Sequence, residues 1–468
     1  MMEIDPGAPR ARSSVLDRWL GAPRDIASLA AFRVLFGLLM ATAMIRFLAR
    51  GWVNELYLLP QFHFTYPGFG WVRPLPDPLM HAHFIALAIL GLMVAAGFCY
   101  RAAILLFFLG FTYVELIDQT AYLNHYYLIS LLSGLMIFLP AHRAWSIDAQ
   151  RRPALKLDVV PVWTIDVLRF QVAVVYFFAG LAKLNADWLL QSQPLRIWLA
   201  ARSDLPLLGP LLNPPWVAFA ASWFGAFYDL TIVFFLMRRR TRRMAFLAVI
   251  FFHVATWVLF NIGMFPWVMI VATTLFFPAD WPRHWLSRFS AFVSGAFKAA
   301  QVARRVNATI AVEHPPRTLA APATRLLPAL LALYAAVQLA LPLRPYLAAQ
   351  PSAWTCSGFN CAWQVMIAEK TGYAELNAFD PAAGKRWKLS LNNYLTPRQE
   401  MMMAQDPYLI RALARRLSRD LRRLGYGSVQ IRADAFATLN GRPSQRLIDP
   451  EVDLAGTLPP GWILPLAR

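Results

Sequence analysis

Long apolar segments recur through the first three quarters of this chain, and they constrain its fold more than any other feature. Crossing about 30 Å of hydrocarbon takes about 20 apolar residues in a helix. Nine segments are expected to span a membrane: Ile26–Leu48, Leu79–Phe98, Ala102–Ile117, His125–Leu139, Val162–Ala182, Trp216–Met237, Met244–Phe260, Met264–Phe277 and Leu326–Leu343. The third and fourth are short, so they would need to tilt or to recruit flanking residues. The sequence therefore predicts a polytopic α-helical membrane protein with about eight or nine transmembrane helices.

The composition agrees with this fold class. Hydrophobic residues make up 58% of the chain and charged residues 15%, whereas about a quarter of a soluble chain is charged. The start of the chain is acidic and contains proline, and the first apolar segment lacks a small-residue cleavage site. No cleavable signal peptide is therefore expected.

Basic residues predict the orientation of the spans. The segment Arg238–Arg243 holds five arginines between two apolar segments, which places it in the cytoplasm by the positive-inside rule. Counting spans from there puts the N-terminus in the cytoplasm and everything after Arg344 outside. The net charge of +19 is then largely an orientation signal. No nucleic-acid motif accompanies it, and no nucleic-acid partner is expected.

These features divide the chain into five parts. We expect a cytoplasmic segment at 1–24, a transmembrane domain at 25–282, a cytoplasmic linker at 283–323, a last transmembrane helix at 324–345 and an extracytoplasmic domain at 346–468. The linker is expected to carry an amphipathic helix that lies on the membrane.

The last part reads as a soluble domain rich in β-strands. Alternating apolar and polar residues predict strands at Tyr373–Phe379, Trp387–Leu391 and Val429–Leu439. Leucines at helical spacing predict an amphipathic helix at Pro407–Leu424. Asn440-Gly441 is a strong signal for a tight turn.

Lys183 follows directly after the apolar span Val162–Ala182. An amine at that place has few hydration partners, and desolvation disfavours its charged form. The residue could therefore supply a free amine that acts as a base. The commoner fate of such a lysine is to extend its ammonium towards the lipid headgroups.

Other polar residues cluster towards the same predicted leaflet. Asn124 and His125 open one span on its outer side, and His253 lies midway along another. Polar side chains in hydrocarbon are costly and often functional, although a buried histidine with a satisfied hydrogen bond is an equal alternative. Three further polar residues within the spans could equally be partners between helices: Asp166, Gln171 and Asp229.

The cysteines leave two alternatives open. Cys356 and Cys361 fall outside the membrane, where a small disulfide loop is possible, but two unpaired thiols are equally consistent. No histidine or cysteine pattern resembles a zinc site, so no metal is predicted.

Several blocks together resemble one family. The lysine block Tyr176–Trp188 looks like the lysine motif of vitamin K-dependent γ-glutamyl carboxylases and their bacterial HTTM-domain relatives. Further blocks are similar to other motifs of this family: Asn124–Leu128, Phe260–Phe265, Trp363–Met366, Leu439–Pro443 and Ile448–Leu454. The resemblance covers about Asp25 to Ala455, and the ordered set is strongly specific.

The resemblance implies an enzyme that oxygenates vitamin K hydroquinone, a reduced menaquinone or phylloquinone, to its epoxide. It implies that Lys183 is the general base that takes a proton from the hydroquinone. Reaction with O2 then gives a base strong enough to remove the γ-proton of a glutamate, which adds CO2. Asn124 and His125 would orient or polarise the quinone oxygen, and His253 is a weaker candidate for the same pocket.

The resemblance also implies a glutamate-containing peptide or protein as the substrate and a lipid quinone and membrane lipids as partners. Trp363 and Arg442 in the external domain would help to hold the peptide. Arg442 could instead pair with Asp449 or Asp453 and hold the domain together. A multi-pass protein of this kind is expected in the bacterial inner membrane.

The chain departs from the family at some positions. Ala182 stands where the animal enzymes have a second lysine, and Gln364-Val365 replaces the usual residues before Met366. Such a relative could retain epoxidation without carboxylation. The alternative from another class is a non-catalytic protein that binds or transports a lipid or quinone, and the presence of Lys183 favours the enzyme.

Overall fold

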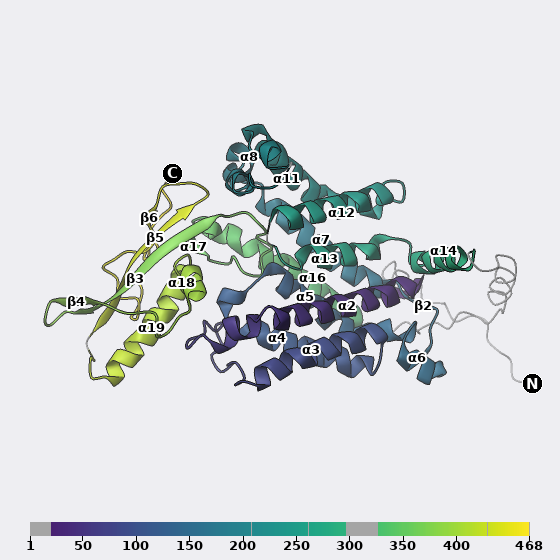
Figure 1. The fold of residues 1–468 in the computed structure, drawn as a ribbon, viewed down its shortest axis with the longest axis horizontal. Coiled ribbons are helices and arrows are strands. Elements are labelled where there is room, and N and C mark those ends of the chain that lie inside the picture. The colour runs from purple at the N-terminus through teal and green to yellow at the C-terminus, as the bar shows by residue number, and fades with distance from the viewer. Residues whose placement is uncertain (1–19, 207, 261, 296–325, 428, 468) are drawn as a thin grey trace, which may run out of the picture.

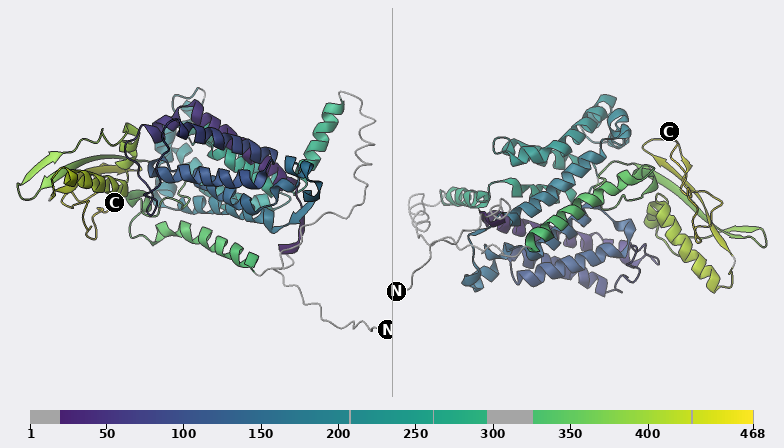
Figure 2. Two further views of the ribbon diagram at one scale, coloured as in Figure 1. Left: turned by 90° about the horizontal axis from the view of Figure 1, so that it is seen from below. Right: turned by 180° about the vertical axis from the view of Figure 1, so that it is seen from behind.

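A helical bundle and a smaller mixed domain lie end to end along the long axis of the molecule (Figure 1). This computed structural model describes residues 20–206, 208–260, 262–295, 326–427 and 429–467. In the view from below, the bundle helices run roughly along this axis and the strands gather beyond one end of them (Figure 2).

Seven helices in the described part of the chain are long and apolar enough to cross a membrane. They are α2 (Ala27–Ala49), α3 (Leu79–Ala96), α4 (Tyr100–Ile117), α7 (Trp163–Ala182), α11 (Pro215–Met237), α12 (Arg242–Leu259) and the segment Leu326–Leu347, which begins with α16 (Leu326–Ala340). Two shorter helices, α5 (Asn124–Phe138) and α13 (Phe265–Thr273), coincide with the other two predicted spans. The predicted class of polytopic α-helical membrane protein with a C-terminal domain rich in β-strands is confirmed.

Short elements connect the spans. Strand β1 (Pro23–Asp25) pairs antiparallel with β2 (Val159–Pro161). The short helices are α6 (Ile147–Arg151), α8 (Ala186–Gln191), α9 (Leu195–Ala200) and α10 (Gly209–Leu212). Helix α14 (Trp281–Gly295) begins where the cytoplasmic linker was predicted, and residues 296–325 of that linker lie outside the described residues.

Glycines set two close helix contacts in the bundle. A Cβ added to Gly37 of α2 would lie 2.4 Å from the backbone nitrogen of Ala95 in α3. A Cβ added to Gly180 of α7 would lie 2.9 Å from the backbone nitrogen of Leu230 in α11. Small residues at such contacts let membrane helices approach closely and pack backbone against backbone. The contact at Gly180 places α11 beside the last turn of α7.

The C-terminal domain, called the external domain here because it lies outside the helical bundle (Figure 1), is a four-stranded antiparallel sheet packed on helices. Its elements are α17 (Ser352–Thr355), β3 (Lys370–Asp380), β4 (Lys385–Lys388), α18 (Pro397–Met403), α19 (Pro407–Arg423), β5 (Gln430–Leu439) and β6 (Gln445–Arg446). The strand order is β4-β3-β5-β6, and Ala374 of β3 lies opposite Ala435 of β5.

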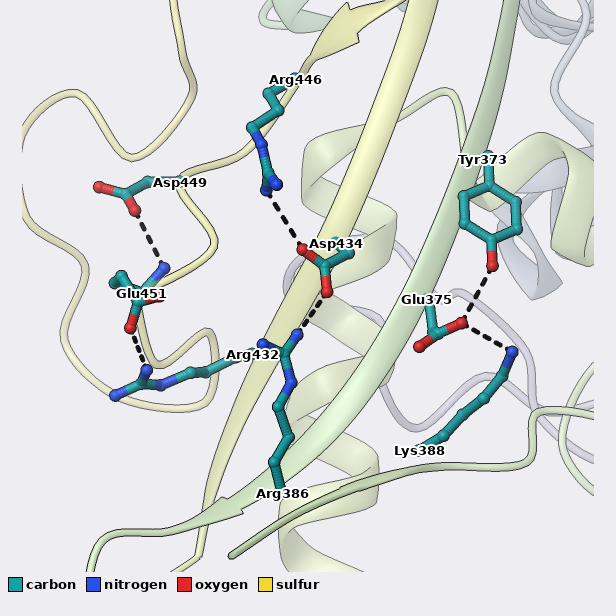
Figure 3. A network of polar contacts seen from close by, with 9 residues as sticks. All are labelled: Tyr373, Glu375, Arg386, Lys388, Arg432, Asp434, Arg446, Asp449 and Glu451. Carbon is teal, nitrogen blue, oxygen red and sulfur yellow. Dashed lines mark hydrogen bonds and ion pairs between the residues drawn. The ribbon is translucent and has the colours of Figure 1, made fainter. Parts of the chain in front are cut away.

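The two faces of this sheet differ as the alternation predicts. Along β5 every second residue is buried, from Ile431 to Leu439, and these side chains share a core with α19. The other face carries a network of charged side chains (Figure 3). There Asp434 accepts hydrogen bonds from Arg386 and Arg446, and Glu375 accepts from Tyr373 and Lys388.

The predicted strands and helix are confirmed, with one difference in length. Strand β4 ends at Lys388, so the residues up to Leu391 are not in a strand, and the buried Leu391 side chain belongs to the external core. Helix α18 was not predicted. Its sequence signal is a capping box, in which Thr396 and Gln399 satisfy each other's backbone N–H groups.

A loop of the bundle enters the core of the external domain. Phe62 and Phe64, which precede α3, pack against the external core. The Gln399 side chain donates hydrogen bonds to the Phe62 carbonyl at 2.8 Å and to the carboxylate of Asp118 at 2.7 Å. These contacts fix the external domain against one end of the bundle. Arg239 and Arg242, from the arginine-rich segment, line a cleft with Asp280. Helix α14, which begins just after Asp280, lies at the other end of the bundle from the sheet (Figure 1).

Candidate active site

The Lys183 amine points into the protein. Lys183 caps the C-terminus of α7, and the residue is only 4% exposed. Its Nζ donates hydrogen bonds to Asp229 Oδ2 at 2.8 Å, to the Ala179 carbonyl at 3.1 Å and to the Val365 carbonyl at 3.3 Å. It also lies 5.2 Å from the centre of the Trp188 ring. The amine therefore does not extend towards the lipid headgroups.

Asp229 on α11 makes this lysine part of a buried pair. The Asp229 side chain is 7% exposed, and the Gly180 contact brings α11 close enough for its carboxylate to reach Nζ. Burial penalises the two separated charges, whereas transfer of one proton from the amine to the carboxylate leaves two neutral groups. The pair can therefore present a free amine without changing its total charge.

An apolar cavity of about 180 Å³ opens beside Lys183. His253 and Tyr176 contribute to its wall, and the Tyr176 hydroxyl lies 2.8 Å from His253 Nε2. Phe224 and Phe251 also line it, and they are 46% and 69% exposed on the outside of the bundle. The cavity thus reaches from the buried amine to the surface between α11 and α12, which would face lipid.

A second, more polar cavity of about 430 Å³ lies next to it. Asn124 and His125, at the start of α5, line this cavity and not the one around Lys183. Arg46 from the end of α2 and Arg398 from α18 also line it. The second cavity therefore combines residues of the bundle with a residue of the external domain.

Four residues line both cavities and form a shared boundary: Ile262, Phe265, Val365 and Met366. The Phe265 ring centre lies 6.1 Å from the His125 ring and 6.0 Å from the His253 ring. The predicted polar residues Asn124, His125, Lys183 and His253 are thus brought to one region, but on two sides of this boundary. Asn261, in the same motif, lies outside the described residues.

The segment after Cys361 carries the external domain into this region. Trp363 is fully buried, and its ring centre lies 5.1 Å from that of Tyr127 on α5. Trp363 and Met366 both have positive φ values, 55° and 56°, which place the Val365 carbonyl at the Lys183 amine. Trp363 therefore packs the boundary segment against α5, and peptide binding by this residue stays a prediction.

Arg442 is held by a partner that the sequence did not suggest. Its guanidinium donates two hydrogen bonds of 2.7 Å to the carboxylate of Asp187 on α8, and Asn440 donates a third at 2.8 Å. The alternative pairing with Asp449 or Asp453 is not the one observed, because the guanidinium binds Asp187. Asp449 and Asp453 instead accept backbone N–H groups.

The Asn440-Gly441 turn explains this contact. Both residues have positive φ values, 52° and 80°, as the tight-turn signal predicts. Burial by itself raises the pKa of Asp187, but hydrogen bonds from Arg442 and Asn440 and the charge of Arg442 outweigh it and lower this pKa. Asp187 is therefore ionised at neutral pH and joins the external domain to the segment that follows Lys183.

Family models match almost the whole described chain. Residues 22–281 match the HTTM domain, and residues 323–468 match the vitamin K-dependent gamma-carboxylase, lumenal domain. The chain belongs to the vitamin K-dependent γ-carboxylase family. No solved structure matches it. It is a multi-pass membrane protein of the carboxylase type, in a family that uses vitamin K and glutamate-containing substrates.

The cysteines of this carboxylase relative are free thiols. Cys356 and Cys361 are not bonded to each other, which corresponds to the second of the two alternatives. Burial raises the pKa of Cys356 to about 12 and also raises that of Cys361. Both thiols are therefore protonated at neutral pH and are poor nucleophiles. Within the described residues no three metal-binding side chains are grouped to hold an ion.

Three residues of the site in this carboxylase relative were not predicted. Asp229 gave a signal, an acidic residue within an apolar span, but a contact between helices was an equal interpretation. Arg46 gave the same kind of signal near the end of the first span. Arg398 gave none, because it reaches the site through the packing of the external domain.

Proposed function

We propose that this protein couples oxygenation of vitamin K hydroquinone to its epoxide with γ-carboxylation of glutamyl residues, with Lys183 as the general base. The observation that carries the proposal is the buried Lys183 amine at the wall of an apolar cavity that reaches the outside of the bundle. A lipid quinone could enter between α11 and α12 without leaving the membrane.

The residues of the apolar cavity suit a quinone ring. Its lining is mainly aliphatic and aromatic, with Lys183, Asp229, His253 and Tyr176 as the main polar groups. Bound reduced vitamin K, with O2 and CO2, would supply the strong base and the new carboxyl carbon. Lys183, as the neutral amine beside a protonated Asp229, would accept the hydroquinone proton, and the single positive charge that it gains would balance the negative charge left on the hydroquinone. The apolar walls would exclude water, which would otherwise quench a strong base.

Asn124 and His125 would act from the other side of the boundary. We propose that they orient or polarise the quinone oxygen where the two cavities meet, at Ile262 and Phe265. The ring of His125 makes no hydrogen bond to another described residue, so it remains available to a ligand. The peptide would enter from the polar cavity, so the two substrates would meet at this boundary.

The membrane orientation follows from the charge distribution. We propose that Arg238–Arg243 lies in the cytoplasm and that the external domain lies outside, in the bacterial inner membrane. The peptide would then be presented from the extracytoplasmic side.

Replacement of the base tests the proposal. Purified Lys183→Ala, supplied with vitamin K hydroquinone and O2, is expected to form no measurable epoxide while it still folds. Added small amines are expected to restore part of the activity if proton abstraction is what the variant lacks. Lys156→Ala is the control, because Lys156 is exposed and lies before the start of α7, at the other end of the helix from Lys183.

Near-wild-type epoxidation in Lys183→Ala would eliminate this lysine as the essential base. Product analysis of the wild-type protein with a glutamyl peptide separates the alternatives: epoxide without carboxylated peptide indicates epoxidation alone, and neither product indicates a binding or transport protein.

A further inference from the structure

Two arginines of the polar cavity have no acceptor for a hydrogen bond or ion pair among the described residues. Neither Arg46 nor Arg398 makes a hydrogen bond or ion pair with another described residue. The Nε atom of Arg46 is buried and has no acceptor. A guanidinium with a buried donor left unpaired is energetically unfavourable, so an acceptor from a ligand would stabilise it.

Their positions make this pair different from the other cations nearby. Arg50, one turn after Arg46, packs over the same Trp52 ring, at 5.5 Å compared with 5.2 Å for Arg46. Only Arg46 of these two lines the cavity. The Arg442 guanidinium is not available to a ligand, because both of its terminal nitrogens donate hydrogen bonds to the Asp187 carboxylate.

Arg46 and His125 approach the same part of the cavity. A Cβ placed on Gly263 would lie 3.6 Å from His125 Nε2 and 3.8 Å from a terminal nitrogen of Arg46. Gly263 also adjoins Ile262 of the boundary with the Lys183 cavity. A group held by Arg46 would therefore lie next to the place where the proposed chemistry occurs.

We propose that Arg46 and Arg398 form the carboxylate-binding site for the glutamyl side chain of the substrate, an inference that rests on the proposed function. The planar guanidinium donates paired hydrogen bonds that match a carboxylate. Arg46 from the bundle holds the carboxylate near the boundary, and Arg398 from the external domain closes the site from outside. Glu55 is exposed at the cavity and contributes one negative charge against these two positive ones.

The proposal predicts how the protein distinguishes glutamate from glutamine. A glutamine side chain has the same shape, but its amide lacks the charge and offers one oxygen in place of two. Hydrogen bonds to charged groups contribute enough to make the difference roughly ten- to a hundredfold in affinity. Arg46 should carry more of this preference than Arg398, because Arg46 is partly buried and Arg398 is exposed.

The test measures binding by fluorescence anisotropy, with the full-length protein in lipid nanodiscs and without quinone. The probes are a labelled glutamyl peptide and the matched glutaminyl peptide. We expect the wild-type protein to prefer the glutamyl peptide, Arg46→Gln to lose most of that preference, and Arg398→Gln to lose a smaller part. Arg50→Gln should retain the wild-type preference for the glutamyl peptide. Arg46→Lys should retain a part of it, because lysine keeps the positive charge but lacks the paired N–H donors of the guanidinium.

Two results would overturn the inference: no preference in the wild-type protein, or an unchanged preference in Arg46→Gln. If Arg46→Gln does not fold, Arg398→Gln and Arg46→Lys decide in its place by the same criterion. The outcome is distinct from that of the proposed function. A charge-selective peptide site in a protein that forms no epoxide would contradict only the function, and active protein with an unaltered preference in Arg46→Gln would contradict only the site.

Discussion

The Lys183–Asp229 pair joins two residues of different helices at the centre of the proposed chemistry. Each side chain is nearly inaccessible, so neither charge is solvated and each depends on the other. Removing one partner of such a pair leaves an isolated buried charge, which is far more unfavourable than removing both. The stability of the pair and its ability to exchange a proton therefore have the same physical origin.

This reasoning predicts a non-additive effect on stability. Asp229→Asn and Lys183→Met should each destabilise the protein by about 3–5 kcal/mol, or by less where the remaining group becomes neutral. The double variant should lose less than the sum of the two, because it contains no unpaired charge. Thermal unfolding in one detergent measures all three. Strictly additive losses would show that the two side chains do not interact as an ion pair.

At the scale of the element, the contact between α7 and α11 decides whether that pair can form. Gly180 has no side chain to hold the helices apart, and a Cβ there would lie 2.8 Å from Leu230 Cγ and 2.9 Å from its backbone nitrogen. The backbone atom cannot rotate away, so even a methyl group must displace α11. Displacement of α11 would move Asp229, the residue before Leu230, away from Lys183.

A matched pair of alanine variants tests this contact. Gly180→Ala should lower the melting temperature and reduce epoxide formation, because it separates α7 from α11. Gly225→Ala on α11 gains the same helix propensity, about 1 kcal/mol, but its new Cβ would have its nearest neighbour at 3.5 Å, an ordinary contact. It should therefore be at least as stable as the wild-type protein. Equal melting temperatures for the two variants would contradict the close-contact explanation.

At the scale of the whole molecule, the external domain completes the site in the bundle. Val365 supplies a carbonyl to Lys183, and Arg398 lines the cavity that contains His125. The Asp187–Arg442 pair fastens the domain directly after the lysine helix. Loosening this attachment should therefore affect both halves of the proposed reaction.

Arg442→Ala tests this attachment. We expect it to lower thermal stability and to reduce epoxidation and carboxylation to a similar extent, because the boundary segment is displaced from Lys183. The exchanged pair Asp187→Arg/Arg442→Asp should recover part of both. Loss of carboxylation alone, at unchanged stability, would instead support peptide binding by Arg442.

The pH dependence of the attachment has a defined sign. The pKa of Asp187 is lowered in the folded protein, so its contribution to stability is fully present above the usual carboxyl value of about 4. That contribution is lost as the pH falls through the lower folded value. The stability difference between the wild-type protein and Arg442→Ala should therefore vanish in strong acid.

The sequence by itself determined the features that depend on local patterns. Apolar length determined the spans, alternation determined strands such as β5, and Asn440-Gly441 determined a turn with two positive φ values. The ordered motifs indicated the family. These signals are readable because helix length, strand period and turn chemistry act over a few neighbouring residues.

Only the tertiary structure decided which polar groups meet. Arg442 and Asp187 are 255 residues apart in the chain, and several acidic residues were possible partners by composition. The division of the site into two cavities likewise depends on Phe265 and Met366, which arrive from different domains. The packing of whole helices and strands decides which distant side chains meet, and the identity of a single residue in the sequence does not specify its partner.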